Sequence, residues 1–209
     1  MNFDLNQSEK TSAESEPSIF LLVGLGNPGR EYRDSRHNIG FMVIDRFCAA
    51  ANIKIGKVQN KALVGVGSFG GHRVIVAKPQ TFMNLSGQAV GPLLRFYRVP
   101  LGHLLVIHDD LDLPFGTIRI RPSGGAGGQK GLASTIQQLG TQDFPRLRMG
   151  IGRPPGQMEV PDYVLARFGR AEEEFLPTWL DRASEAAQSF IRQGIELTMT
   201  RFNGNGLEG

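Results

Sequence analysis

Apolar residues fall into short continuous runs and helical patterns that alternate along the first half of the chain. Residues 19–25 are apolar throughout, which is typical of a strand buried on both faces. From residue 38 to residue 51, apolar side chains recur every three or four positions and predict a helix, with Asn38 as a possible N-cap. Residues 62–69 and 73–77 predict two strands that a pair of glycines joins into a hairpin.

The same alternation continues in the second half. Residues 117–121 alternate strictly between apolar and basic side chains, so Arg119 and Arg121 share one face of a predicted strand. The patterns also predict helices over residues 86–98, 132–139 and 171–202, strands over residues 104–108 and 147–151, and a loop over residues 153–162.

These elements predict an α/β fold in a single domain, with a mixed, mostly parallel central sheet flanked by helices on both faces. The domain is expected to span residues 18–203. The polar, acidic residues 1–17 predict a flexible N-terminal tail, and residues 204–209 a C-terminal tail. The N-terminal stretch lacks an apolar segment, so neither a signal peptide nor an Arg-rich transit peptide is expected.

Composition and charge narrow the function classes. With 40% hydrophobic and 21% charged residues and no apolar run that could cross a bilayer, the chain is expected to be globular and to have no membrane partner. Residues 1–17 contain one basic side chain, Lys10, and four carboxylates, so the formal charge of the rest of the chain is +6 instead of +3. This excess is compatible with a polyanionic partner but does not prove one. Cys48 is the single cysteine, which excludes an internal disulfide and a zinc cluster and favours a reducing, cytoplasmic location.

The stretch VGLGNPGREYRDSRHN contains the spacing G-x-G-x-x-G, which dinucleotide-binding loops use. Pro28, however, removes a backbone N–H from the turn that would donate to phosphate, and a densely charged segment follows instead of a helix. Asp45 lies near the distance expected for the ribose-binding acid, but within a predicted helix. The glycines therefore favour a tight turn over a nucleotide site.

Polar side chains at strand ends suggest different chemistry. Asn27, Asn84 and Asp109 follow three predicted strands, and His37 precedes a helix. A histidine that takes a proton from water, a carboxylate that orients it and two amides that bind the carbonyl form a set suited to ester hydrolysis. The asparagines could instead serve turns or caps, and His37 could be a surface or capping residue. A third possibility is a Mg²⁺ site made by Asp109 with the other carboxylates of HDDLD.

Five motifs follow one another in a fixed order: GLGNPGREYRDSRHNIGF, KPQTFMNLSG, HDDLDLPFG, GGAGGQKGL and FPRLRMGIGRP. Together they resemble the bacterial-type peptidyl-tRNA hydrolase family, and the resemblance runs from about Ile19 into the C-terminal helical region. It implies an enzyme that cleaves the ester between a prematurely released peptide and the 3′ end of its tRNA. It also implies that the enzyme needs no metal or other cofactor.

The resemblance implies roles for particular residues. His37 would be the catalytic base, Asp109 its orienting partner, and Asn27 and Asn84 the amides that position substrate and stabilise the carbonyl. The family's cleft-lining and tRNA-binding positions correspond to Tyr32, Phe82, Arg119, Arg121 and Arg148. Many members carry a His-Asn pair where this chain has Gln129 and Lys130, and these two residues are expected to contact substrate through amide and phosphate interactions.

Two rival hypotheses remain at this point. A non-catalytic RNA-binding or RNA-processing factor could use the same scaffold, and a Mg²⁺-dependent phosphohydrolase could use HDDLD. The interpretation adopted is a metal-independent peptidyl-tRNA hydrolase that rescues ribosomes by recycling tRNA, with peptidyl-tRNA as its partner. Since no interface motif is evident, the chain is expected to be a monomer.

Overall fold

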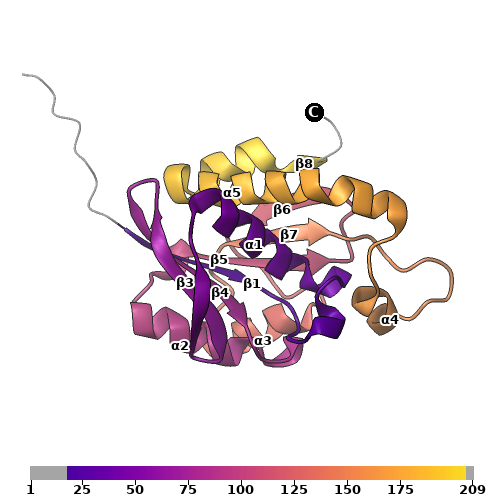
Figure 1. The fold of residues 1–209 in the computed structure, drawn as a ribbon, viewed down its shortest axis with the longest axis horizontal. Coiled ribbons are helices and arrows are strands. Elements are labelled where there is room, and N and C mark those ends of the chain that lie inside the picture. The colour runs from indigo at the N-terminus through magenta and orange to yellow at the C-terminus, as the bar shows by residue number, and fades with distance from the viewer. Residues whose placement is uncertain (1–17, 206–209) are drawn as a thin grey trace, which may run out of the picture.

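The structure, a computed structural model, describes residues 18–205, and Figure 1 shows their arrangement. The predicted tail of residues 1–17 and residues 206–209 lie outside the described residues. Gly204 and Asn205 form a short strand, although they fall in the stretch assigned to the C-terminal tail. No helix among residues 18–205 is long and apolar enough to cross a membrane.

One sheet runs through the described part of the chain. Its eight strands have the order β2-β3-β4-β1-β5-β7-β6-β8. In chain order they are β1 (Ile19–Gly24), β2 (Ile55–Gln59), β3 (Ala62–Phe69), β4 (His72–Pro79), β5 (Leu104–Asp110), β6 (Thr117–Arg121), β7 (Arg146–Gly150) and β8 (Gly204–Asn205).

The strand directions confirm the predicted mixed, mostly parallel sheet. Strands β4, β1, β5 and β7 lie side by side and run parallel, while the remaining neighbours pair antiparallel. Within residues 18–205, β3 and β6 are therefore the strands that oppose the common direction. The parallel strands β1 and β5 occupy the centre and are buried almost completely, as their continuous apolar sequences predict.

Helices cover both faces of the sheet, as predicted (Figure 1). The helices α1 and α5 pack on one face, around a core that includes Phe47, Trp179 and Phe190. The helices α2 and α3 pack on the other face, around Leu93, Val106 and Leu132. Their bounds are α1 (Ile39–Ala51), α2 (Gly87–Tyr97), α3 (Lys130–Leu139), α4 (Val160–Leu165) and α5 (Arg170–Phe202).

Two elements differ from the sequence prediction. The edge strand β2 was not predicted, because its sequence IGKVQ is largely exposed and lacks an alternating apolar pattern. The short helix α4 begins inside residues 153–162, which were predicted to be a loop. Its proline near the N-terminus is compatible with a first helical turn, although the neighbouring prolines and glycines indicated irregular structure.

The glycine spacing of the first motif serves packing and a turn. A side chain at Gly24 would clash with the carbonyl oxygen of Gly40, so this glycine lets α1 cross β1 at close range. Gly29 has a φ of 116°, a conformation that side chains rarely adopt. Only a short 3-10 turn (Arg30–Tyr32) follows directly, and helix α1 begins ten residues after Gly29, whereas a dinucleotide-binding loop opens directly into an α-helix.

Candidate active site

A cleft of about 410 Å³ lies where the parallel strands β1, β4 and β5 end. Because the carboxyl ends of parallel strands meet at one edge of a sheet, residues distant in sequence converge there. Most residues singled out from the sequence line this cleft: Asn27, Tyr32, His37, Phe82, Asn84, Asp109, Gln129 and Lys130. The three arginines predicted to face tRNA lie outside the lining.

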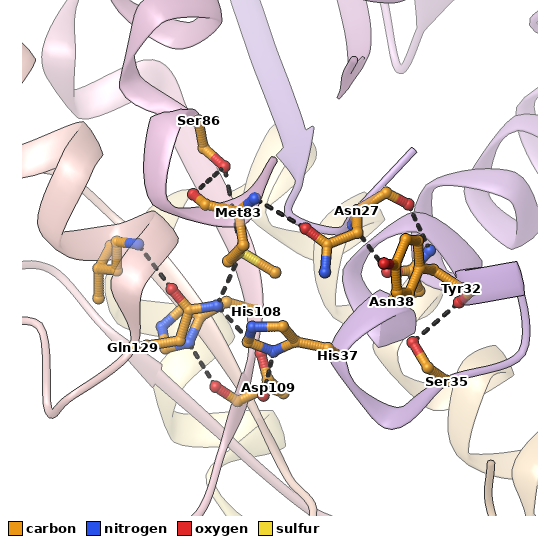
Figure 2. Close-up of polar contacts among 11 residues, drawn as sticks. Asn27, Tyr32, Ser35, His37, Asn38, Met83, Ser86, His108, Asp109 and Gln129 are labelled. Carbon is orange, nitrogen blue, oxygen red and sulfur yellow. Dashed lines mark hydrogen bonds and ion pairs between the residues drawn. The ribbon is translucent and has the colours of Figure 1, made fainter. Parts of the chain in front are cut away.

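His37 and Asp109 form a close pair in this cleft. The Nδ1 atom of His37 lies 2.8 Å from Oδ2 of Asp109, whose side chain is 3% exposed (Figure 2). A carboxylate accepts hydrogen bonds, so the Nδ1–H group donates, and in the neutral ring Nε2 then carries the lone pair. His37 belongs to the short helical turn η2 (Arg36–Asn38), directly before α1. This geometry suits a neutral imidazole that accepts a proton at Nε2.

Arg36 attaches the histidine-bearing turn to the C-terminal part of the chain. Its guanidinium lies over the ring of Tyr163 at 4.4 Å and over that of Phe168 at 5.3 Å. It also donates to Glu172 at 2.7 Å and to the carbonyl of Arg167. The buried cation therefore connects η2 with α4 and with the first turn of α5.

Asn27 is held by Asn38, for which the sequence predicted an N-cap role. Asn38 occupies the N-cap position of α1, but its side chain does not cap the helix. Instead its Oδ1 accepts from the backbone N–H of Asn27 at 2.8 Å, and its Nδ2 donates to the Asn27 carbonyl at 2.9 Å. These two bonds, which we call the Asn38 clamp, fix the turn that carries Asn27.

The amide of Asn27 is oriented by a third bond. Its Oδ1 accepts from the backbone N–H of Met83 at 2.8 Å. Among residues 18–205 the donor group Nδ2 has no hydrogen-bond partner, and Figure 2 shows it turned away from Met83. Asn27 therefore presents a hydrogen-bond donor at the cleft.

The outer part of the cleft is more exposed. Asn84 lies on the short turn η3 (Met83–Leu85) and does not cap α2, whose N-cap position is Ser86. Phe82, its neighbour in sequence, is 59% exposed, and Tyr32, which also lines the cleft, is half-buried. The unpredicted helix α4 completes an apolar wall with Val160, Pro161, Val164 and Leu165.

The glycine-rich loop brings Gln129 and Lys130 to the cleft. Gln129 is buried and serves as the N-cap of α3, because its Oε1 accepts from the backbone N–H of Leu132 at 2.7 Å. Its Nε2 donates to Oδ1 of Asp109 at 3.0 Å and lies 3.2 Å from the sulfur of Met83. Lys130 is exposed at the first position of α3, where its ammonium group reaches solvent.

The three carboxylates of HDDLD have separate partners. Asp109 pairs with His37, Asp110 with Arg148 at 2.6 Å, and Asp112 with Arg153. In the part of the chain that the structure describes, no three His, Cys, Asp or Glu side chains are placed to hold a metal ion together. The hypothesis of a Mg²⁺ site in this motif stays a prediction that activity in the presence of a metal chelator would test.

The predicted tRNA-facing arginines gather on one face of the sheet. Arg119 on β6 lies opposite Arg148 on β7, and Arg121 lies opposite Arg146. The side chains of Arg121, Arg146 and Arg148 line a second hollow of about 320 Å³ beside the glycine-rich loop. Arg119 does not line it. This hollow is rich in positive charge, although Arg148 is partly neutralised by its ion pair.

Arg146 and His108 complete the second hollow and were not identified from the sequence. Arg146 is buried and donates to the carbonyls of Gly124, Gln142 and Phe144, which holds the glycine-rich loop. Burial, together with nearby Arg148, lowers the pKa of Arg146 to about 10, so it remains a cation at neutral pH. Burial also lowers the pKa of His108, which is therefore a neutral side chain in this hollow at neutral pH.

Known proteins are similar to this chain in both sequence and fold. The sequence profile of the family "Peptidyl-tRNA hydrolase" matches residues 21–208. A peptidyl-tRNA hydrolase of Chloroflexus aurantiacus is 48% identical over 186 residues, which are 88% of this chain and 99% of that protein. A chloroplastic peptidyl-tRNA hydrolase of Arabidopsis thaliana is 45% identical over 204 residues, which are 96% of this chain and 71% of that protein.

A solved structure of the same family superposes on this chain. The crystal structure of peptidyl-tRNA hydrolase from Acinetobacter baumannii superposes with a TM-score of 0.85 at 34% identity. The match covers 91% of this chain and 98% of the other. Sequence and fold therefore point to the same family over nearly the whole length of both chains.

Proposed function

The chain belongs to the peptidyl-tRNA hydrolase family and is a peptidyl-tRNA hydrolase, and from this premise we propose that His37 is its general base. The single observation that carries the proposal is the 2.8 Å contact between Nδ1 of His37 and Oδ2 of Asp109 at the cleft. In this proposal Asp109 holds the ring in the tautomer whose Nε2 faces substrate and stabilises the imidazolium that forms.

In the first step, Nε2 of His37 removes a proton from a water molecule in the cleft. The water oxygen forms a bond to the ester carbonyl carbon, and the carbonyl electron pair moves onto oxygen. The imidazolium then returns its proton to the 3′ ribose oxygen as the carbon–oxygen ester bond breaks. The products are a peptide with a free carboxyl group and a tRNA with a free 3′ hydroxyl.

Two amides bind the carbonyl oxygen as it becomes negative. Asn27 is suited to this role because its Oδ1 accepts from the Met83 N–H, which leaves Nδ2 as a donor that no other described residue engages. Asn84 offers a second amide from the exposed rim of the same cleft. A preorganised donor of this kind contributes about 100- to 1,000-fold to the rate of acyl-transfer reactions.

Substrate binding extends from this centre in two directions. The apolar wall made by α4 suits peptide side chains, and Tyr32 and exposed Phe82 offer aromatic faces to the peptide or to the terminal adenosine. Exposed Lys130 can pair with a phosphate of the acceptor end. The second hollow, with Arg121 and Arg148, is proposed to meet the tRNA backbone, and Arg119 extends the basic face.

The experiment follows release of an N-acyl-aminoacyl group from tRNA, with a metal chelator present, for the wild type and Asp109→Asn. The amide can reverse the hydrogen bond to Nδ1 and thereby select the wrong imidazole tautomer. The variant should bind tRNA with near-normal affinity, but its kcat should fall by about 1,000-fold or more. An unchanged kcat would remove Asp109 from the mechanism, and loss of wild-type cleavage in chelator would contradict metal independence.

The hypothesis of a non-catalytic RNA-binding factor finds no support, since the relatives compared above are hydrolases. Cytoplasmic location remains a prediction, and the chloroplastic relative makes an organelle the alternative compartment to examine by fractionation. A monomeric state also remains a prediction, which light scattering of the purified protein tests directly.

A further inference from the structure

Gln129 contacts the catalytic carboxylate on the side opposite His37. Oδ2 of Asp109 receives the hydrogen bond from His37, and Oδ1 receives one from Nε2 of Gln129 at 3.0 Å (Figure 2). Asp109 is 3% exposed and Gln129 is 8% exposed, so water has little access to this contact. A buried carboxylate needs such donors, because an anion removed from water without hydrogen bonds is strongly disfavoured.

The orientation of the Gln129 amide follows from a second contact. The backbone N–H of Leu132 can only donate, so the atom of Gln129 that lies 2.7 Å from it must be the oxygen. The amide nitrogen therefore has to face Asp109. The first turn of α3 thus fixes which end of the amide meets the carboxylate.

Both polar atoms of the Gln129 side chain are therefore engaged inside the protein. We propose that Gln129 is a positioning residue that holds the plane of the Asp109 carboxylate, and so the direction of the His37 ring, from the N-terminus of α3. This inference rests on the proposed roles of His37 and Asp109. It assigns Gln129 an action through Asp109, in place of the direct substrate contact predicted from the sequence.

Gln129→Glu tests the donor specifically. The substitution keeps the length of the side chain and an oxygen that caps Leu132, but it places a second oxygen against Oδ1 of Asp109. Two carboxylates this close share a proton or repel one another, and either outcome disturbs the hydrogen bond to His37. We expect kcat for N-acyl-aminoacyl-tRNA cleavage to fall roughly 10- to 100-fold at neutral pH, with KM within about twofold.

Three companion proteins make the result decisive. Gln137→Glu adds the same charge at an exposed position of α3 and should keep kcat within about twofold of the wild type. In the Asp109→Asn background, Gln129→Glu should change kcat by less than about threefold, because the carboxylate it acts on is gone. His37→Ala gives the rate without the proposed base.

The results of these measurements distinguish the positioning role of Gln129 from the proposed roles of His37 and Asp109. If Gln129→Glu retains wild-type kcat while His37→Ala is inactive, the proposed function stands and the positioning role of Gln129 is wrong. If the double variant loses a further 10-fold or more, Gln129 acts independently of Asp109, which also overturns the inference. If His37→Ala itself is active, the proposed mechanism fails before Gln129 is considered.

Discussion

Replacing Asn38 with alanine should lower both the stability of the fold and the rate of catalysis. Asn38 is 2% exposed and makes the clamp on the backbone N–H and carbonyl of Asn27, at 2.8 and 2.9 Å. Asn38→Ala removes both bonds and leaves two main-chain groups of Asn27 without partners. Since each such buried group costs about 1–3 kcal/mol, we expect the free energy of unfolding to fall by about 2–4 kcal/mol after partial relaxation.

The substitution should change both the melting temperature and the catalytic rate. In a domain of this size each kcal/mol lowers Tm by about 2–4 °C, so Tm should fall by roughly 5–15 °C. The turn that carries Asn27 should also lose its fixed position, and kcat should fall by about 10- to 100-fold as a donor to the ester oxygen moves away. Thermal unfolding and tRNA-ester cleavage measured well below Tm give the two quantities.

The chain provides a matched control for this experiment. Asn203 makes the same pair of bonds to the main chain of a different residue, Ile120. Its Oδ1 accepts from the N–H of Ile120 at 2.6 Å, and its Nδ2 donates to the Ile120 carbonyl at 3.1 Å. Asn203→Ala should lower Tm but keep kcat within about twofold, since it holds β6 rather than the cleft. If both variants lower Tm and neither changes kcat, the Asn38 clamp does not position Asn27 for catalysis.

Three other predictions concern substrate binding and the single thiol. Arg121→Ala should raise KM and reduce the slope of log affinity against log salt by about one, and an unchanged slope would mean that this arginine does not meet phosphate. Phe82→Ala should raise KM roughly tenfold with little change in kcat, whereas a selective fall in kcat would contradict a binding role. Burial raises the pKa of Cys48 to about 12, so at pH 8 about one thiol in ten thousand is ionised. Iodoacetamide should therefore label the folded protein far more slowly than the denatured one, and equal rates would show that the thiol is accessible.

Much of the fold could be predicted because its central strands have distinct patterns. The buried strands β1 and β5 are continuous apolar runs, and β6 alternates perfectly, so their positions were evident from hydropathy alone. Strand β2 and helix α4 were missed since both are short and mostly exposed or rich in proline. Strand β2 forms by pairing with β3, which begins after two intervening residues, and α4 packs through Tyr163 against Arg36 of the distant turn η2.

The site was predictable to a similar degree. The sequence indicated the polar groups at strand ends, because parallel strands bring their carboxyl ends to one edge. It could not reveal that Asn38 clamps a backbone instead of capping α1, because both uses suit an asparagine before a helix. The contact of Gln129 with Asp109 was also hidden, since it depends on how α3 meets β5.

A single-turnover measurement tests whether His37 acts as the base. Saturating enzyme is mixed with N-acyl-aminoacyl-tRNA in chelator, and the first-order cleavage rate of His37→Ala is compared with that of the wild type. Binding is measured separately, so that a change in affinity cannot be mistaken for a change in chemistry. If His37 is the base, the cleavage rate of the variant should be at least about 1,000-fold lower, with tRNA affinity within about twofold of the wild type. Cleavage by the variant at a rate near that of the wild type would contradict this role of His37.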